Sequence, residues 1–494
     1  MMSEQTPDPR LTRRRQIRSF AMLWSVLTVI IGVITFIAIF VASGFILSPA
    51  TGSNAVSAAE ITSPPPLPAT SIPATPIPMV VPQVAQQNPP TDAPAEADSG
   101  GEAPAAVAQA VTDTPEPTPE PTLSAIERTD FDFGIQVQES FDIYDYWMIV
   151  VSDQLHLDWV KHQVRWEDMQ PTQGEIDWTI LDIVIPTAHA HGLNVMLSIV
   201  TTPEWAREPG ADLTKHGPPA DPQNYVNFVT AILNRYQDEY PGTIGAIEVW
   251  NEMNIDREWA SVNGLDSGEY IELLAATYNA VKAIDPGIIV ISGALSPTGG
   301  WVEPDGRVSA VDDFDYLDAL IRDGLLSYTD CVGAHHNGYN IGPLVPWDEA
   351  PNDPEAATAI FRGPFDNPHH SWSLYSTLTT YRSKIQLAGG DQRLCVTEFG
   401  WAVTEDMGGF PAGFEFAQDN TLVEQGEYIM EAVQWMAESD VVWLAWLWNL
   451  NYGIQSGFDP NNDNGPYSIL RPNSVPAPAW DAIAQYRMEQ IAEQ

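Results

Sequence analysis

Between residues 243 and 294 the chain reads TIGAIEVW (243–250), then EYIELLAATYNAVKAIDP (269–286), then IIVISGA (288–294). The first and third runs are short and almost continuously apolar, which is typical of strands that are buried on both faces. In the middle run, apolar residues recur at the spacing of an amphipathic helix, at Ile271, Leu274, Ala275, Tyr278 and Val281. The segment therefore predicts a strand–helix–strand unit of a parallel sheet.

The same alternation extends over the C-terminal three quarters of the chain. Further strand candidates are FDFGIQV (131–137), WVKHQVRW (159–166), NVMLSIV (194–200), CVGAHH (331–336), RLCVTEF (393–399) and VVWLAWLW (441–448). Residues 178–192 and 424–439 carry helical patterns. Eight such units in about 370 residues predict an α/β fold, a closed (β/α)8 TIM barrel, over 126–494. A doubly wound open sheet is the alternative, but no glycine-rich phosphate turn follows the first strand.

Composition excludes several classes of protein. The chain has 494 residues, a formal net charge of −45 and two cysteines. So negative a chain repels phosphate backbones, and we expect no nucleic-acid partner. Two cysteines exclude a disulfide scaffold and a four-cysteine zinc site.

The N-terminal segment predicts a membrane anchor. Five arginines and two acidic residues lie in residues 1–18, and residues 19–47 contain no charged residue. About 20 apolar residues span a bilayer, whereas a cleaved signal peptide has an apolar core of about 7–15 residues. We therefore expect residues 19–47 to be a single-pass transmembrane signal anchor in contact with the lipid bilayer. The arginines keep 1–18 in the cytoplasm, which places the rest of the chain outside the cell membrane.

Residues 48–125 have the composition of a linker. They contain 17 of the 42 prolines and no lysine, arginine or aromatic residue. Such a segment cannot bury enough apolar surface to offset the entropy of ordering, so it predicts a disordered, extended stalk. A set of ligands for domains that bind polyproline is the alternative, but the proline motifs lack basic flanks.

Two glutamates stand at the carboxyl ends of predicted strands. Glu252 follows the strand at 243–250, and Glu398 ends the strand at 393–399. In a barrel these ends meet at one mouth, where catalytic residues of the fold lie. A pair of carboxylates there suits glycoside hydrolysis, with one as general acid and one as nucleophile.

The motifs around these glutamates resemble those of a known group of enzymes. VWNEMN (249–254) and VTEFGW (396–401) are similar to the acid/base and nucleophile motifs of the retaining glycoside hydrolases of clan A, with families 5 and 39 (cellulase or beta-xylosidase type) nearest. The resemblance covers about residues 130–490. It also includes VRWEDMQPTQGEIDW (164–178), TTPEWA (201–206) and the C-terminal run at 467–483.

The resemblance implies a role for each matching residue. Glu252 would be the acid/base and Glu398 the nucleophile, with the anomeric configuration retained. Asn251 would bind the sugar 2-hydroxyl. Arg165 would hold the nucleophile ionised and in place, unless it forms only a structural ion pair.

Substrate-binding residues are expected on other strand ends. The clan shows His-x-Tyr after the sixth strand, where this chain reads HHNGY (335–339). We expect His335 near the acid/base and Tyr339 near the nucleophile, with His336 as the alternative inward residue. Trp448, with Trp446 as the alternative, resembles the clan's tryptophan on which the bound sugar ring stacks.

The remaining candidates have structural alternatives. Trp205 is a further sugar-binding candidate, and other loop tryptophans could equally be packing residues, namely Trp259, Trp301, Trp347 and Trp401. Glu248 reads as a buried structural carboxylate, and Cys331 and Cys395 as two buried thiols rather than a disulfide. The His335-His336 pair cannot share a zinc ion, because adjacent strand residues point to opposite faces. No metal or other cofactor is expected.

Three functions fit this sequence. The first is a membrane-anchored, extracellular retaining β-glycosidase that hydrolyses a β-linked polysaccharide or oligosaccharide, with endo action favoured. The second is a carbohydrate-binding pseudoenzyme on the same barrel. The third is a transglycosylase or hydrolase in exopolysaccharide assembly, which would use the same carboxylates.

Overall fold

The computed structural model describes residues 130–138, 143–352 and 369–493. The predicted cytoplasmic tail (1–18), membrane anchor (19–47) and proline-rich linker (48–125) all lie outside the described residues. Among the residues that are described, no helix combines the length and the apolarity needed to cross a membrane.

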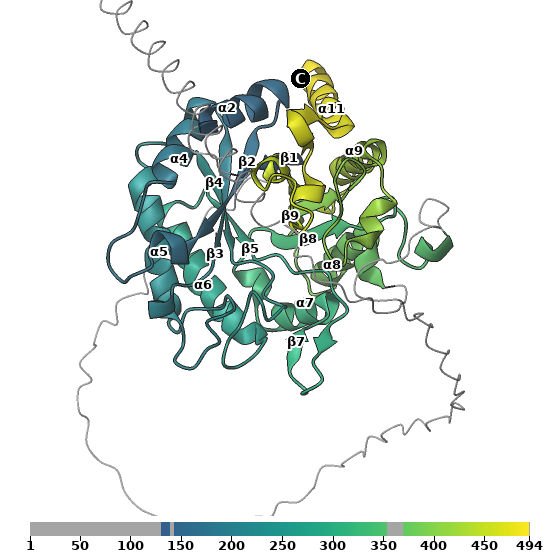
Figure 1. Ribbon diagram of the computed structural model, residues 1–494. Helices are drawn as coiled ribbons and strands as arrows, with labels where there is room; N and C mark the ends of the chain where they lie inside the picture. The colour runs from purple at the N-terminus through teal and green to yellow at the C-terminus, as the bar shows by residue number, and fades with distance from the viewer. Residues whose placement is uncertain (1–129, 139–142, 353–368, 494) are drawn as a thin grey trace, which may run out of the picture. The chain divides into compact units, whose positions relative to one another are not determined.

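Eight parallel strands form the barrel that the sequence predicts (Figure 1). Their order is β5-β4-β3-β2-β1-β10-β9-β8, and isolated bridges from Ile291 to Cys331 and from Leu295 to Ala334 join β5 to β8. Each strand overlaps one predicted run. The strands are β1 (Asp132–Gln136), β2 (Trp159–Arg165), β3 (Asn194–Val200), β4 (Ile244–Val249), β5 (Ile289–Ser292), β8 (Val332–Gly338), β9 (Leu394–Trp401) and β10 (Val442–Leu447).

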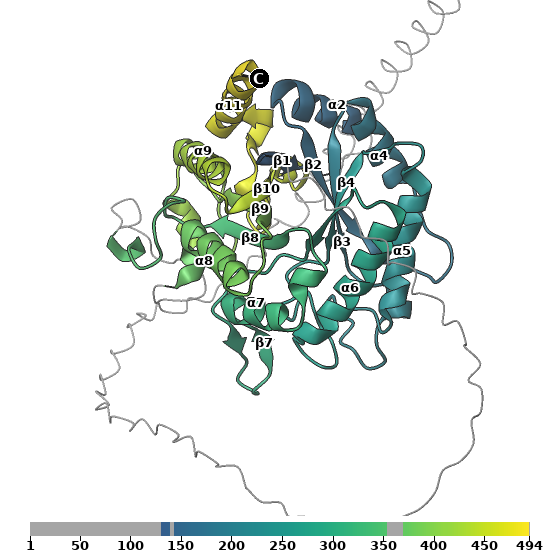
Figure 2. The ribbon, with the colours of Figure 1, turned by 180° about the vertical axis from the view of Figure 1, so that it is seen from behind.

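Helices surround the strands, as both views show (Figures 1 and 2). The helix predicted at 269–286 begins where the Asp266 side chain accepts a hydrogen bond from the Glu269 N–H, and α9 begins with a capping box of Thr421 and Glu424. The helices are α2 (Tyr144–Ile149), α3 (Trp166–Met169), α4 (Leu181–Ala190), α5 (Pro222–Tyr236), α6 (Ser267–Ile284), α7 (Asp313–Arg322), α8 (Leu374–Leu387), α9 (Leu422–Glu438), α10 (Tyr452–Gln455) and α11 (Pro478–Glu493).

Successive side chains of a strand point to opposite faces of the sheet, so the core has one part inside the barrel and one part between the strands and the helices. In β3, Val195 and Leu197 belong to the cluster between the strands and the helices, whereas Met196 belongs to a second cluster. This second cluster contains Trp159 and Trp446, whose rings meet edge to face with centroids 5.6 Å apart. Strands that are buried on both faces explain why the sequence runs are continuously apolar.

A short hairpin that the sequence pattern did not predict attaches to the loop after β4. It consists of β6 (Trp301–Val302) and β7 (Val308–Ala310), and a second small ladder joins β11 (Leu470–Arg471) to β12 (Val475–Pro476). Ala310 bridges to Ile255, and Asp256 N–H donates to the Ser309 carbonyl at 2.8 Å. The hairpin therefore braces the loop that carries Glu252.

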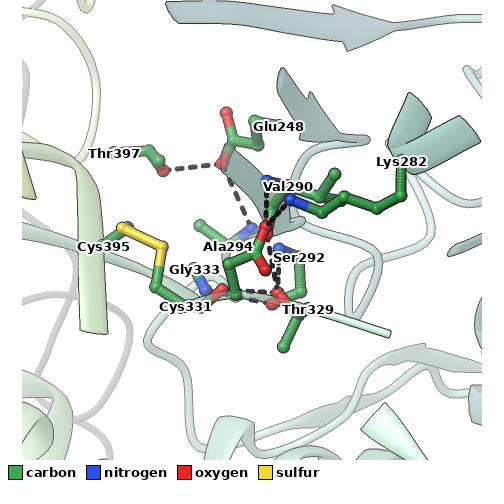
Figure 3. The surroundings of a disulfide bond; sticks show 11 residues. Glu248, Lys282, Val290, Ser292, Ala294, Thr329, Cys331, Gly333, Cys395 and Thr397 are labelled. Carbon is green, nitrogen blue, oxygen red and sulfur yellow. Dashed lines mark hydrogen bonds and ion pairs between the residues drawn. A yellow bond between two sulfur atoms is a disulfide. The ribbon is translucent and has the colours of Figure 1, made fainter. Parts of the chain in front are cut away.

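Cys331 and Cys395 form a disulfide, which corrects the prediction of two free thiols (Figure 3). Cys395 lies in β9 and Cys331 immediately precedes β8, and these strands pair with Gly333 opposite Cys395. The two Cα atoms are 5.7 Å apart, which is within the range for disulfides. The sequence predicted neighbouring strands but not the lateral register that brings the sulfur atoms together.

We expect loss of this disulfide to destabilise the barrel. It closes a loop with a sequence separation of 64 residues, so its removal is expected to lower the free energy of unfolding by about 2–4 kcal/mol. Urea unfolding of the Cys331→Ala/Cys395→Ala variant beside the oxidised parent measures this difference. Two results together would contradict the disulfide. The variant would unfold at the same urea concentration as the parent, and the parent, unfolded without a reductant, would have two thiols that can be alkylated.

Candidate active site

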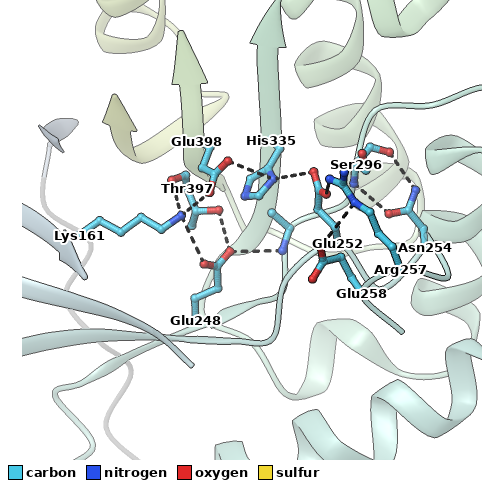
Figure 4. A network of polar contacts seen from close by, with 11 residues as sticks. Lys161, Glu248, Glu252, Asn254, Arg257, Glu258, Ser296, His335, Thr397 and Glu398 are labelled. Carbon is cyan, nitrogen blue, oxygen red and sulfur yellow. Dashed lines mark hydrogen bonds and ion pairs between the residues drawn. The ribbon is translucent and has the colours of Figure 1, made fainter. Parts of the chain in front are cut away.

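The two predicted carboxylates meet at the carboxyl ends of the strands (Figure 4). Glu252 follows β4, Glu398 lies in β9, and His335 of β8 stands between them. His335 Nδ1 is 3.2 Å from Glu252 Oε1 and 3.8 Å from Glu398 Oε2. All three residues are buried.

These two distances limit the separation of the carboxylates. The Glu252 and Glu398 oxygens that face His335 cannot be farther apart than about 7 Å, the sum of the two contacts. Retaining glycosidases place their carboxyl groups about 5–5.5 Å apart, and inverting enzymes about 6.5–9.5 Å apart. The limit of about 7 Å is compatible with the retaining spacing and reaches only the lower end of the inverting one.

Lys161 is the cation that holds Glu398. Its Nζ lies inside the barrel, 2.9 Å from Glu398 Oε1, and donates to the Thr397 carbonyl at 3.1 Å. Glu248 Oε2 lies 4.0 Å from the same ammonium group, and Thr397 Oγ1 donates to Glu248 Oε1 at 2.6 Å. Glu248 is fully buried in this network, so its position fits the structural carboxylate predicted for it.

The structure corrects the prediction that Arg165 holds the nucleophile. Arg165 Nε donates to Asp168 Oδ2 at 2.9 Å, and its guanidinium also pairs with Glu167. Its side chain is 41% exposed at the end of β2. Lys161 and Arg165 share a strand face but lie four residues, or about 13 Å, apart. The resemblance therefore identified the strand that carries the cation, but not which residue along that strand contacts Glu398.

We expect Lys161→Met to destabilise the protein strongly. It leaves Glu398 and Glu248 buried without their cation, and breaking a buried pair on one side costs about 3–5 kcal/mol. Urea unfolding measures the loss, with Lys384→Met as the control, because the pair of Lys384 with exposed Asp318 is expected to contribute about 1 kcal/mol or less. Equal losses in the two variants would contradict the assignment.

The loop that carries Glu252 has an unusual backbone. Trp250 and Glu252 have φ angles of 75° and 45°, in the left-handed region that non-glycine residues rarely adopt. Such positions cost of order 1–3 kcal/mol and persist where the surroundings hold them. Here Glu252 N–H donates to the Ala294 carbonyl at 2.8 Å, and Trp250 Nε1 donates to the Glu258 carbonyl at 3.0 Å. The fold thus directs Glu252 into the mouth despite the strain.

Charged neighbours set the protonation of this centre. Burial alone would raise the pKa of Glu252, but the hydrogen bond with His335 and the charge of Arg257 lower it to about 2. Arg257 Nη2 is 3.1 Å from Glu252 Oε2. Burial opposes the charge on His335, yet Glu398 and Glu252 raise the pKa of His335. In the free protein Glu252 is therefore ionised, with Arg257 and His335 beside it.

His335 and His336 point to opposite sides of β8, as adjacent strand residues must. His335 reaches both carboxylates, whereas burial lowers the pKa of His336 to about 3 and keeps its ring neutral. The structure therefore places His335, and not His336, at the mouth.

A cavity of about 610 Å³ opens above the carboxylates. Asn251 lies on its wall beside Glu252 and is largely buried. Within the described part of the chain, Asn251 Oδ1 has no hydrogen-bond partner. A buried, unpaired acceptor on a cavity wall suits a ligand hydroxyl group. The cavity is lined by Gln163, Asn251, Glu252, Arg257, Glu258, Ser296, Pro297, Asn337, Tyr339, Ser371, Glu398, Gly413, Phe414, Phe416, Trp448, Asp463, Asn464 and Tyr467.

Two of the predicted aromatic residues line this cavity. Trp448 follows β10, and Lys161 Nζ lies 5.8 Å from the centroid of its ring. Tyr339 packs edge to face on Phe416, with ring centroids 4.9 Å apart. Burial, then the charges of Asp313 and Glu252, raise the pKa of Tyr339 to about 12, so its hydroxyl group stays protonated.

The cavity has a further aromatic residue, Tyr467, that the sequence analysis did not single out. Among the described contacts, Tyr339 makes no hydrogen bond to Glu398. Tyr467 lines the same cavity, and burial, together with nearby charges that include Glu398, raises its pKa. Its place in the run 467–483, which carries part of the resemblance, was the signal that could have identified it.

The structure corrects the prediction for Trp205. Its ring packs edge to face on Trp166 at 5.7 Å, and its Nε1 donates to the Gln170 carbonyl at 2.9 Å. It does not line the cavity among the described residues. Of the other tryptophans, Trp259, Trp401 and Trp446 are buried, and Trp301 and Trp347 are exposed.

His369 and His370 precede α8 and contact the residues at the start of α7. His369 Nε2 is 3.2 Å from Asp312 Oδ2, and His370 Nε2 is 2.8 Å from Asp313 Oδ1. Asp312, His369 and His370 each present a ligand atom within 4.8 Å of the others. Ser371 N–H donates to His369 Nδ1, which directs the Nε2 proton of His369 toward Asp312. These bonds anchor the chain that leads into α8.

Comparison with protein families confirms the resemblance predicted from the motifs. The family model Glyco_hydro_42, described as beta-galactosidase, matches residues 148–241, from within α2 to just beyond α5. The match ends before Glu252, so the roles of the two carboxylates rest on the geometry above. The chain thus resembles the clan A glycoside hydrolases. A search of the curated proteins finds no match.

Solved structures with similar folds include three glycoside hydrolases. One is a family 39 glycoside hydrolase from Bacteroides cellulosilyticus WH2, with 16% identity, a TM-score of 0.49 and coverage of 72% of this chain and 62% of that chain. A monomeric beta-xylosidase from Caulobacter crescentus CB15 has 18% identity, a TM-score of 0.49 and coverage of 73% and 69%. Xylanase 10B from Thermotoga petrophila RKU-1, in complex with xylobiose, has 13% identity, a TM-score of 0.46 and coverage of 73% and 95%.

Proposed function

We propose that this chain is a retaining β-glycosidase that hydrolyses O-glycosidic bonds of a β-linked polysaccharide. The observation that supports this best is the pair of buried carboxylates, Glu252 and Glu398, which share His335 at the barrel mouth. Two carboxylates in different environments are what double displacement requires. Glu398 is paired with the buried Lys161, Glu252 with the exposed Arg257, and both carboxylates line the cavity.

Each residue then has a defined task. Glu398 attacks the anomeric carbon while Glu252 protonates the departing oxygen, which gives a covalent glycosyl-enzyme. Glu252 next removes a proton from water, and that water releases the sugar with its original configuration. Asn251 offers its unpaired oxygen to a sugar hydroxyl group, and Trp448 offers a flat face to the ring.

Charges in the cavity favour neutral sugars. Glu252, Glu398 and Asp463 line it, and Arg257 is the cation among the described lining residues. A sugar that carries a carboxylate would meet like charges in a partly desolvated site, which is unfavourable. We therefore propose a neutral β-glycan as the substrate, and endo action on it remains the expectation from the sequence.

We also propose that the barrel works outside the cell membrane. The support is the sequence alone: the apolar run 19–47, the arginines before it, and the proline-rich segment 48–125. In this arrangement the linker would hold the barrel away from the bilayer. Protease treatment of intact cells, with a tag at each terminus, tests the orientation: loss of the C-terminal tag alone is expected, and protection of both tags would contradict it.

A substrate screen tests the activity. The full-length protein in detergent is incubated with aryl β-glycosides, with glucan, xylan and mannan polymers, and with their uronate-bearing counterparts. We expect turnover of a neutral member of the panel. New glycosides formed with an added acceptor sugar would identify a transglycosylase instead, and binding without any turnover would identify a binding protein.

A further inference from the structure

Arg257 lies between two carboxylates on the wall of the cavity (Figure 4). Its Nη2 is 3.1 Å from Glu252 Oε2, and its Nε is 3.5 Å from Glu258 Oε1. The Arg257 side chain is 67% exposed, whereas those of Glu252 and Glu258 are only 11% and 21% exposed. The cation is therefore the member of the three that can move when a ligand enters.

The two carboxylates differ in protonation. Burial, and then the charge of Glu252, raise the pKa of Glu258 to about 7, although Arg257 opposes the shift. The pKa of Glu252 is about 2. In the free protein near neutral pH, a proton that this pair holds is therefore on Glu258 rather than on Glu252. His335, whose Nδ1 is 3.2 Å from Glu252 Oε1, is the other ionisable group that faces Glu252, and Arg165, Glu398 and Asp463 act on Glu258 or Arg257.

This arrangement conflicts with the first step of double displacement, in which Glu252 donates a proton. With its lowered pKa, Glu252 is ionised near neutral pH in the free protein and has no proton to donate. A general acid works best when its pKa is near the working pH. Something must therefore deliver a proton to Glu252 after the sugar binds.

We propose that Arg257 and Glu258 form a proton switch for Glu252. A sugar that enters the cavity moves the Arg257 guanidinium from Glu252 to Glu258, and the proton of Glu258 passes to Glu252. The O–H bond on Glu258 breaks and an O–H bond on Glu252 forms, so the three residues keep one proton and one cation throughout.

Electrostatics favours this direction of transfer. A carboxylate that loses a cation holds its proton more strongly, and one that gains a cation releases it more easily. Both changes follow from one movement of Arg257. Glu252 remains the catalytic residue, and Arg257 and Glu258 are positioning residues. The inference deepens the proposed function and rests on it.

The pH dependence of kcat/KM tests the switch in the full-length protein. With a substrate whose leaving group is poor, we expect kcat/KM of the parent to fall as the pH rises through about 7. This decline, the basic limb of the profile, has an apparent pKa that belongs to the Glu252–Glu258 pair. In Glu258→Gln the only remaining proton site of the pair is Glu252. The limb should therefore move below pH 5, and kcat/KM at pH 7 should fall about 100-fold or more. A dinitrophenyl leaving group needs no proton, so its cleavage should change less than about threefold.

Two further variants separate the switch from general damage. Glu258→Asp keeps a carboxyl group that titrates, so it should retain a basic limb within one pH unit of the parent, and it serves as the test if Glu258→Gln does not fold. Arg307→Gln is the matched control, because Arg307, between β6 and β7, pairs with Asp256 of the Glu252 loop and makes no contact with Glu252 among the described interactions. Its pH profile should equal that of the parent.

The possible results are distinct. An unchanged basic limb in Glu258→Gln, in a protein that hydrolyses its substrate through Glu398, would overturn the switch and leave the proposed function standing. Equal losses for good and poor leaving groups would also overturn it, because they would indicate a structural role. Absence of any hydrolysis by the parent would overturn the proposed function itself.

Discussion

Replacing Glu398 by glutamine is expected to abolish turnover of every substrate that the parent cleaves. The amide keeps the shape of the side chain, and its oxygen can still accept a hydrogen bond from Lys161, so folding should persist. It cannot form the glycosyl ester, and we expect kcat/KM to fall at least about 10⁴-fold, or about 5.5 kcal/mol of transition-state stabilisation. Initial rates with an aryl glycoside, beside near-UV circular dichroism of both proteins, measure the effect.

Asp463→Asn is the matched control for this variant. It also removes one carboxylate from the cavity lining, but Asp463 has no contact with His335 or Lys161 among the described interactions. Its rate should stay within about tenfold of the parent. A folded Glu398→Gln protein with substantial activity would show that Glu398 is not the nucleophile.

Glu252→Gln is expected to separate substrates by leaving group. A glycoside whose leaving group needs protonation should lose about 10²–10⁴-fold in kcat, the usual contribution of a general acid. An activated aryl glycoside should form the glycosyl-enzyme almost normally and then stall, because no base activates water. A burst followed by slow turnover in stopped-flow measurements would show this.

Added azide provides the complementary test. As an anion it needs no general base, so it should restore turnover of the activated substrate by Glu252→Gln and yield a β-glycosyl azide. In the parent, azide should have little effect. A uniform loss for all leaving groups, with no rescue by azide, would remove Glu252 from the acid/base role.

The barrel could be predicted because each of its strands and helices can be recognised from the residues within it. Each of the eight strands carries its own apolar run, and the alternation with helices fixes a parallel sheet. The positions of Glu252 and Glu398 followed from the same reasoning, since both stand at strand ends. The β6–β7 hairpin escaped prediction because its strands have two and three residues, too few for any period to show.

The features that the sequence did not reveal depend on the register between strands and on how far along a strand a side chain lies. Lys161 and Arg165 lie on the same face of β2, and only the stagger between β2 and β9 decides that Lys161 reaches Glu398. The same holds for the disulfide, which needs the lateral register of β8 and β9. Trp205 was assigned to the cavity from its place after β3, but its ring turns toward Trp166.

The central claim is that Glu398 forms a covalent bond with the sugar. The most direct measurement uses a 2-deoxy-2-fluoro glycoside with an activated leaving group, made with whichever sugar the substrate screen identifies. Peptide mass spectrometry after inactivation should show one added fluoroglycosyl group on Glu398, and none in Glu398→Gln. A label on another residue, or undiminished turnover with no label, would contradict the account.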